Sequence, residues 1–276
     1  MKIRYVLVVL LGIYLLALAG LFTFQRSFLY FPSQEHVFLS DAHANRAFKE
    51  FSVRTEDGID LTAWYAPATS KPFTIVFFHG NGDRLYIASP IADPYIAAGY
   101  GFLLAEYRGY SGLPGKPTEA GLYADARAYI KGLMAQGVKS ENIILYGHSL
   151  GTGVSVQMAE EFPVGGVMLL APYLSIAEMA QRNFPYFPAK YIALDRFEND
   201  TKMKNIHAPV LVVNGTGDQI IPPSEGRELY TMANEPRHFY SIPGRGHNDC
   251  FDDFAVISLD WVKGLRAANS KSDAPK

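Results

Sequence analysis

The chain has 276 residues, of which 49% are hydrophobic and 19% charged, and its formal net charge is −2. This composition excludes a disordered chain, because enough apolar surface is present to offset the entropy of ordering. The lack of any run rich in Lys and Arg argues against nucleic acid as a partner. The single cysteine, Cys250, excludes an intrachain disulfide and any multi-cysteine metal site.

The N-terminal segment resembles a membrane-spanning helix. Residues 6–24 carry no charge, and as a helix they would span roughly 28 Å, about the hydrocarbon thickness of a bilayer. Lys2 and Arg4 precede this run and Arg26 follows it, and positive residues favour the cytoplasmic side. We therefore expect residues 1–25 to be an uncleaved single-pass anchor. The rest of the chain would lie on the non-cytoplasmic side, which is the periplasm in a bacterium.

Two alternatives to the anchor stay open. Residues 17–19 read Ala-Leu-Ala before Gly20, as at a signal-peptide cleavage site, although the apolar run is longer than the usual ~7–15 residues of a signal peptide. A buried globular helix is the other alternative. Residues 28–32, FLYFP, predict an aromatic belt at the membrane interface, and an apolar strand that leads into the fold is a compatible alternative.

Beyond residue 26 the chain alternates short apolar runs with helical patterns. Strands are predicted at 51–55, 61–66, 73–78, 102–106, 142–146, 164–170, 209–214 and 237–242. Helices are predicted at 84–98, 118–135, 149–162, 223–234 and 252–266. Strands that alternate with helices pair in parallel, so the pattern predicts an α/β domain over 26–266, with a mostly parallel twisted sheet and helices on both faces. Residues 267–276 lack apolar periodicity, and we expect them to be disordered.

One long interval interrupts this alternation, about 173–207, and it is rich in aromatic residues. Pro185 and Pro188 prevent a single helix there. A long insertion at one end of a sheet is often a lid, although ordinary packing over the sheet remains an equal alternative. If the interval is a lid, its aromatics can line an apolar acyl pocket, and the candidates are Phe184, Phe187 and Tyr191.

The strongest motif is Gly-His-Ser-Leu-Gly at 147–151, which lies between a predicted strand and a predicted helix. In that context G-x-S-x-G forms a sharp turn that exposes the serine hydroxyl, here of Ser149. The flanking glycines let neighbouring backbone approach without a Cβ clash. We therefore expect Ser149 to be a nucleophile.

A serine nucleophile needs a base and a group that orients the base, in the chain order Ser, Asp/Glu, His. Of the histidines after Ser149, His207 and His238 fall beside or inside strands, whereas His247 lies in a glycine-rich loop. His247 is therefore the expected base. Asp218 follows the strand before it and is the expected orienting acid.

An oxyanion intermediate needs two preorganised N–H donors. One is expected at Leu150, directly after the nucleophile, and the other in the loop His79-Gly80-Asn81-Gly82 after the 73–78 strand. We assign the second donor to the Asn81 N–H and expect His79 to support the loop; a plain glycine turn is the alternative.

The order of the motifs resembles that of α/β-hydrolase serine hydrolases. The motifs are HGNGD, YRGY followed by GKPTEAGLYADA, GHSLG, NGTGDQIIP and GRGHND. With QRSFLYFP after the apolar run, the chain resembles the membrane-anchored bud-emergence type, which is related to depalmitoylating hydrolases. The resemblance covers about 24–265 and implies an α/β-hydrolase fold with Ser149, Asp218 and His247 as catalytic triad. Residues 107–115 depart from the usual Y-R-G-Y-G-x-S-x-G, so no role is carried over to that loop.

Together these patterns predict a serine hydrolase that cleaves carboxylic esters or thioesters through an acyl-enzyme. The expected partners are a small-molecule or lipid-like acyl ester and, through the anchor, the membrane; no metal or organic cofactor is implied. A serine peptidase or an acyltransferase on the same scaffold is the main alternative, and a non-catalytic binding module on the membrane is another. The sequence does not indicate the acyl chain, the leaving group or the oligomeric state.

Overall fold

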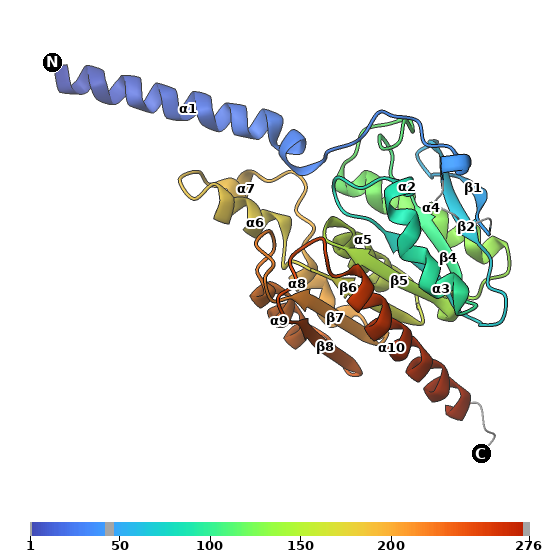
Figure 1. Ribbon diagram of the computed structural model, residues 1–276. Helices are drawn as coiled ribbons and strands as arrows, with labels where there is room; N and C mark the ends of the chain where they lie inside the picture. The colour runs from blue at the N-terminus through green and yellow to red at the C-terminus, as the bar shows by residue number, and fades with distance from the viewer. Residues whose placement is uncertain (1, 42–46, 273–276) are drawn as a thin grey trace.

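The fold is built on one sheet. The structure is a computed structural model that describes residues 2–41 and 47–272, with side chains as far as Leu265. Within these residues eight strands pair in the order β1-β2-β4-β3-β5-β6-β7-β8 (Figure 1). Their bounds are β1 (Lys49–Arg54), β2 (Asp60–Ala66), β3 (Thr74–Phe78), β4 (Gly101–Ala105), β5 (Ile143–His148), β6 (Gly166–Leu170), β7 (Val210–Gly215) and β8 (Arg237–Ile242). All pairs from β4 to β8 are parallel, and β2 pairs antiparallel with both of its neighbours, β1 and β4. The predicted mostly parallel sheet is confirmed.

Helices cover both faces of the sheet, as the alternating pattern predicts. Their bounds, with the short 3₁₀ turns, are η1 (Leu39–Asp41), α2 (Leu85–Ala88), η2 (Ser89–Ala92), α3 (Asp93–Ala97), α4 (Glu119–Ala135), η3 (Ser140–Asn142), α5 (Leu150–Glu161), α9 (Pro223–Met232) and α10 (Phe251–Ser272). Helices α4, α5 and α9 contribute to the core on one face, and α2, α3 and α10 to the core on the other. Alternate side chains of a strand face opposite sides of the sheet, so each strand contributes to both cores. In β3, Val76 and Phe78 belong to the first core, and Ile75 and Phe77 belong to the second.

Two predicted helix boundaries are wrong. The expected helix 84–98 is divided into α2, η2 and α3, because Pro90 and Pro94 have no N–H to continue a helical ladder. At the other end, α10 continues to Ser272, into the segment expected to be disordered; residues 273–276 of that segment lie outside the described residues.

The interval between β6 and β7 forms a helical insertion above the carboxyl ends of the strands. It contains α6 (Ile176–Asn183), α7 (Ala189–Ile192), α8 (Asn199–Lys202) and η4 (Met203–Asn205). Pro185 and Pro188 lie between α6 and α7 and prevent a single helix, as expected. We call α6, α7 and the loop that joins them the lid.

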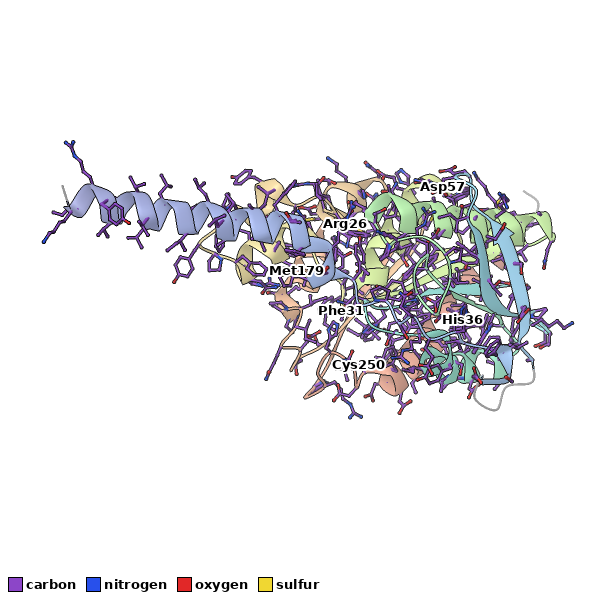
Figure 2. The ribbon with its side chains drawn as sticks, turned by 90° about the horizontal axis from the view of Figure 1, so that it is seen from above. Arg26, Phe31, His36, Asp57, Met179 and Cys250 are labelled. Atoms are coloured by element: carbon purple, nitrogen blue, oxygen red, sulfur yellow. The ribbon has the colours of Figure 1, made fainter. Side chains whose placement is uncertain are left out.

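The N-terminal helix α1 (Lys2–Leu29) projects from the domain as a rod, and the lid lies beside its C-terminal half (Figures 1 and 2). By length and composition α1 is a candidate membrane span. The expectation of a strand at 28–32 is wrong: α1 includes Phe28 and Leu29, and the Tyr30 N–H still bonds the Arg26 carbonyl.

Candidate active site

Ser149 lies at the sharp turn between β5 and α5. Its φ of 51° and ψ of −118° are strained for a residue with a side chain. The flanking glycines are sterically required: a Cβ on Gly147 would lie 2.5 Å from the Gly151 carbonyl oxygen, and one on Gly151 would lie 1.9 Å from that of Phe78. The turn therefore holds the Ser149 hydroxyl at the carboxyl end of the sheet, where the predicted elbow requires it.

Two further side chains meet Ser149 from loops that follow later strands. His247 Nε2 lies 2.9 Å from Ser149 Oγ, and His247 Nδ1 lies 2.7 Å from Asp218 Oδ2. The loop after β7 supplies Asp218, and the loop between β8 and α10 supplies His247. The three residues that the sequence singles out are thus joined by one chain of hydrogen bonds, although 98 residues separate Ser149 from His247.

The local environment keeps Asp218 ionised. Burial alone would raise the pKa of its carboxyl, but hydrogen bonds from His247 and from the Ile221 and Ile220 N–H groups outweigh burial and lower the pKa below its ordinary value. An ionised carboxylate accepts from His247 Nδ1, which leaves Nε2 to face the serine hydroxyl. The other candidate histidines lie elsewhere: His238 Nδ1 accepts from Trp261, and His207 is exposed before β7.

The two residues expected to supply the oxyanion donors, Asn81 and Leu150, line the same cavity as Ser149. The Leu150 N–H is the first of helix α5, where amides have no intrahelical acceptor. In the facing loop, the Gly80 N–H donates to Asp83 Oδ2 at 3.1 Å and is therefore occupied. No backbone acceptor in the described part of the chain takes the Asn81 N–H. The Asn81 and Leu150 N–H groups are therefore both available, consistent with the sequence assignment.

A buried ion pair supports the loop that carries Asn81. His79 Nε2 lies 2.7 Å from Glu106 Oε1, and His79 Nδ1 lies 2.6 Å from the Gly80 carbonyl oxygen. Burial alone would lower the pKa of His79, but the Glu106 carboxylate outweighs it and raises the pKa. Glu106 also accepts from the Ser111 hydroxyl, at 2.5 Å. The structural role predicted for His79 thus has a specific partner.

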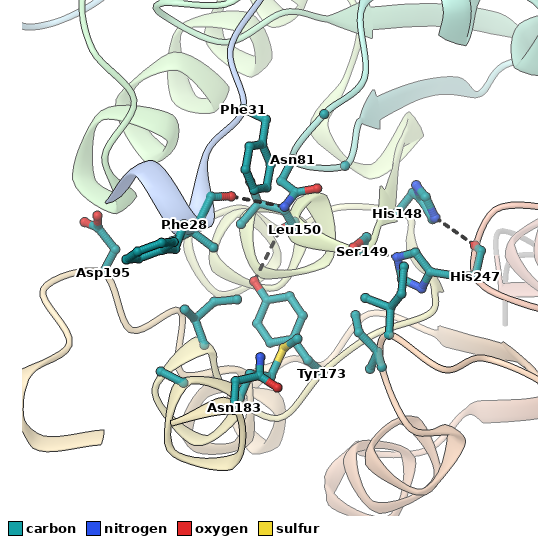
Figure 3. A pocket seen from close by; sticks show the side chains of 18 of the residues that line it. Phe28, Phe31, Asn81, His148, Ser149, Leu150, Tyr173, Asn183, Asp195 and His247 are labelled. Atoms are coloured by element: carbon teal, nitrogen blue, oxygen red, sulfur yellow. Dashed lines mark hydrogen bonds between the residues drawn. The ribbon is translucent and has the colours of Figure 1, made fainter. Parts of the chain in front are cut away.

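A cavity of about 820 Å³ opens over Ser149 (Figure 3). The Ser149 hydroxyl and His247 lie at its floor, and Tyr173 and the lid form one side. Most of the wall is apolar, and three elements supply the greater part of it: α1 with its exit segment, α2 with η2, and the lid with the residue after it. Their apolar members are Leu21, Phe28, Leu29, Phe31, Ile87, Ala88, Ile91, Ile176, Met179, Ala180, Phe184, Ala189, Ile192 and Ala193, and other elements add Leu150, Ile220, Ile221 and Phe251.

Known proteins share this sequence and this fold. The alpha/beta hydrolase family matches residues 75–203. An uncharacterized protein of Mycobacterium tuberculosis is 38% identical over 229 residues, which cover 82% of this chain and 81% of that protein. Human alpha/beta hydrolase domain-containing protein 17B is 33% identical over 209 residues, 74% of this chain and 70% of the human one.

The chain belongs to the alpha/beta hydrolase family.

Solved structures agree with the fold of this hydrolase. An esterase of Pyrococcus furiosus superposes with a TM-score of 0.69 at 18% identity, over 86% of this chain and 96% of that one. An alpha-beta hydrolase of Vibrio vulnificus superposes with a TM-score of 0.68 at 23% identity, over 82% and 84% of the two chains. At these identities the likeness bears on the fold alone.

The structure corrects two of the three acyl-pocket residues expected in this hydrolase. Phe184 lines the cavity, but Phe187 and Tyr191 do not. Phe187 stacks on Tyr14 of α1 with ring centroids 5.2 Å apart, and Tyr191 is 81% exposed. The aromatic composition of the interval predicts a lid, but composition does not predict which side chains of a short irregular segment face the cavity.

Sequence reasoning also missed residues that the structure brings to the hydrolase site. Leu21, Gln25 and Phe28 of α1 form part of the cavity wall, and their spacing of four and then three places them on one helix face. Asp83 faces the His148 ring at 3.7 Å. Burial alone would raise the pKa of the Asp83 carboxyl, but His148, His79 and the Gly80 N–H together outweigh burial, and the pKa falls to about 2.

Proposed function

We propose that this hydrolase cleaves carboxylic esters or thioesters through an acyl-enzyme formed on Ser149. The observation that carries the proposal is the hydrogen-bond chain from Ser149 Oγ through His247 to Asp218, with distances of 2.9 and 2.7 Å, at the floor of an apolar cavity. A strained serine within reach of an oriented imidazole is the arrangement that nucleophilic acyl transfer needs.

In the proposed reaction His247 Nε2 takes the Ser149 proton as the hydroxyl oxygen attacks the acyl carbonyl carbon. The Asn81 and Leu150 N–H groups hold the oxyanion that forms. The protonated His247 then gives its proton to the leaving alcohol or thiol as the carbonyl re-forms and the acyl-enzyme remains. In the second half His247 takes a proton from water as the water oxygen attacks the acyl carbonyl carbon. The protonated His247 then returns the proton to Ser149 Oγ as the Oγ–acyl bond breaks and the acid leaves. Asp218 stabilises the imidazolium in both halves.

The apolar wall of the cavity favours a substrate whose acyl chain is apolar and binds in the cavity. Each methylene buried there would recover roughly 0.8 kcal/mol. Helix α1 supplies part of that wall, so we also propose that α1 stays attached as an anchor, with the domain on the non-cytoplasmic side of the membrane, the periplasm in a bacterium. The positive residues Lys2 and Arg4 before the apolar run support this orientation.

Pre-steady-state hydrolysis of p-nitrophenyl esters and of the matching thioesters tests the acyl-enzyme. We expect a rapid burst of leaving group equal to the enzyme concentration whenever deacylation is the slower step, and no burst from Ser149→Ala. A burst of unchanged size in folded Ser149→Ala would contradict the proposed nucleophile.

A further inference from the structure

We propose that the lid tip, defined as residues 184–191 (FPYFPAKY), inserts into the lipid bilayer beside α1. The inference rests on the anchor proposed above, since it takes α1 as a membrane-spanning helix, but it concerns a different surface. Its partner is the hydrocarbon of one leaflet. The lid tip begins with six residues that carry no charge, Phe184 to Ala189, and the first charge is Lys190.

The lid tip contacts α1 in the middle of its apolar run. The Tyr14 ring stacks on Phe187 with centroids 5.2 Å apart and planes 12° apart, and the Tyr14 hydroxyl donates to the Tyr186 carbonyl at 3.2 Å. Tyr14 lies near the centre of the uncharged residues 6–24. The ribbon shows the loop before α7 extending along α1, away from the sheet (Figure 1). A bilayer that surrounds this part of α1 therefore meets the lid tip as well.

The depth of the lid tip follows from the helix rise. Arg26 is the first charged residue after the apolar run of α1, and it pairs with the buried carboxylate of Asp195 at 2.7 Å. We therefore place Arg26 at the membrane surface. Tyr14 lies twelve residues earlier, roughly 18 Å along the helix axis. The headgroup layer accounts for roughly 5–7 Å of that distance, and helix tilt shortens the depth further. The tip thus reaches the hydrocarbon of the near leaflet without crossing it.

A loop in hydrocarbon must satisfy its backbone polar groups internally. Two of the residues in the lid tip, Pro185 and Pro188, have no N–H to satisfy. The Phe187 N–H donates to the Phe184 carbonyl at 3.1 Å, and the Tyr186 carbonyl accepts from the Tyr14 hydroxyl.

The side chain of Gln181 satisfies two more groups of the lid tip. Its Nε2 donates to the Phe187 carbonyl at 3.0 Å, and its Oε1 accepts the Lys190 N–H at 3.2 Å. The Tyr191 N–H donates to the Pro188 carbonyl at 3.0 Å. These bonds lower the number of backbone polar groups that insertion would leave unsatisfied, although the Tyr186 and Ala189 N–H groups have no acceptor within the described residues.

Side-chain exposure and charge agree with this placement. Tyr186 is 87% exposed and Tyr191 is 81% exposed, so these rings project from the protein with no described neighbour to cover them. Lys190 pairs with Glu178, and its long stem lets the charge stay at the headgroup level. Because Phe184 and Leu21 both line the cavity over Ser149, an acyl chain would reach the site directly from the bilayer.

Depth-dependent fluorescence quenching tests the proposal on the full chain. Tyr186→Cys, Leu10→Cys and Val256→Cys each receive an environment-sensitive fluorophore in phosphatidylcholine vesicles, with nitroxide groups on the lipid acyl chains as quenchers. Leu10 reports the anchor, and Val256, 72% exposed on α10, reports a surface remote from α1. The native Cys250 does not compete for the label, because it is 1% exposed and burial raises the pKa of its thiol to about 11.

We expect the nitroxide lipids to quench the label at position 186 about as strongly as the label at position 10. The label at position 256 should not be quenched. Quenching at position 10 with none at position 186 would overturn the inserted lid tip while the anchor stands. No quenching at position 10 would overturn the anchor and the lid tip together. Tyr191→Cys is the second reporter, and retained ester hydrolysis shows that each labelled chain is folded.

Discussion

The carbonyl oxygen of Leu29, at the end of α1, accepts a hydrogen bond from Asn81 Nδ2 at 3.1 Å, across 52 residues of sequence (Figure 3). Two more bonds hold the same residue: the Phe31 N–H at 3.1 Å and the Tyr110 hydroxyl at 2.9 Å both donate to the Asn81 carbonyl. The residue proposed to stabilise the oxyanion is therefore fixed by the segment through which the chain leaves α1.

Asn81→Ala keeps the backbone N–H and removes only the bond to Leu29. A neutral hydrogen bond contributes roughly 0.5–1.5 kcal/mol, so we expect kcat to fall by roughly 3–10-fold with little change in KM. Asn234→Ala is the matched control, because its Nδ2 also donates to backbone carbonyls, those of Lys204 and Ile206, but far from Ser149. Steady-state kinetics decides: equal losses of kcat in the two variants would contradict a positioning role for Asn81.

Ser149→Ala and His247→Ala should each lower kcat by several orders of magnitude. Members of one hydrogen-bond chain act as a unit, so the double variant should be little slower than either single variant. Rates for all three, at matched thermal stability, provide the test. Losses that multiply in the double variant would show that the two residues act independently.

Much of this site was predictable from the sequence, because it depends on local patterns. A strand, G-x-S-x-G and a helix in succession indicate Ser149, and chain order with loop context then selects Asp218 and His247. The glycine loop after β3 likewise indicates Asn81. These signals are local because turns and strand ends are encoded by neighbouring residues.

The remainder depends on contacts between distant segments. No pattern near Asn81 indicates its bonds to Leu29 and Phe31, and none indicates that Phe187 turns toward Tyr14 instead of the cavity. The predicted single helix at 84–98 is wrong for a different reason, since Pro90 and Pro94 interrupt its apolar pattern. Tertiary packing, which the sequence reports only indirectly, decided the contacts of Asn81 and Phe187.

Gly151→Ala should destabilise the fold. The added Cβ would lie 1.9 Å from the Phe78 carbonyl oxygen, so backbone must move, and we expect a loss at or above the upper end of roughly 1–3 kcal/mol. Gly264→Ala is the control: its Cβ meets no atom within 4 Å, and alanine in a helix favours the folded state by up to ~1 kcal/mol. Thermal melting in detergent measures both; equal melting temperatures for the two variants would contradict the steric argument.

The pair of Asp83 and His148 should make stability depend on pH in acid. Because the folded pKa of Asp83, about 2, lies below its ordinary value near ~3.9, the ionised carboxylate stabilises the fold above about pH 4. That contribution is lost as the pH falls from about 4 to about 2. Melting temperatures of wild type and Asp83→Asn should therefore differ most near neutral pH and converge through this window. A difference that stays constant through it would contradict the assignment.

Phe184, which lines the cavity, and Tyr191, which does not, give a sharp test of the acyl site. In wild type each added methylene should raise kcat/KM by up to ~4-fold until the cavity is full. Phe184→Ala should reduce that gain for hexanoyl and octanoyl esters and spare acetyl. Tyr191→Ala, which lies outside the cavity, should leave the chain-length dependence in detergent unchanged. A flat dependence in wild type would reject the apolar acyl site.

The central claim is that Ser149 is an activated nucleophile, and labelling with a fluorophosphonate tests it most directly, because only such a serine reacts rapidly. We expect one phosphonyl group per chain, located on Ser149 by peptide mass spectrometry, with labelling that is greatly slowed in His247→Ala. Absence of the adduct from the folded wild-type protein, or an adduct on another residue, would contradict the account.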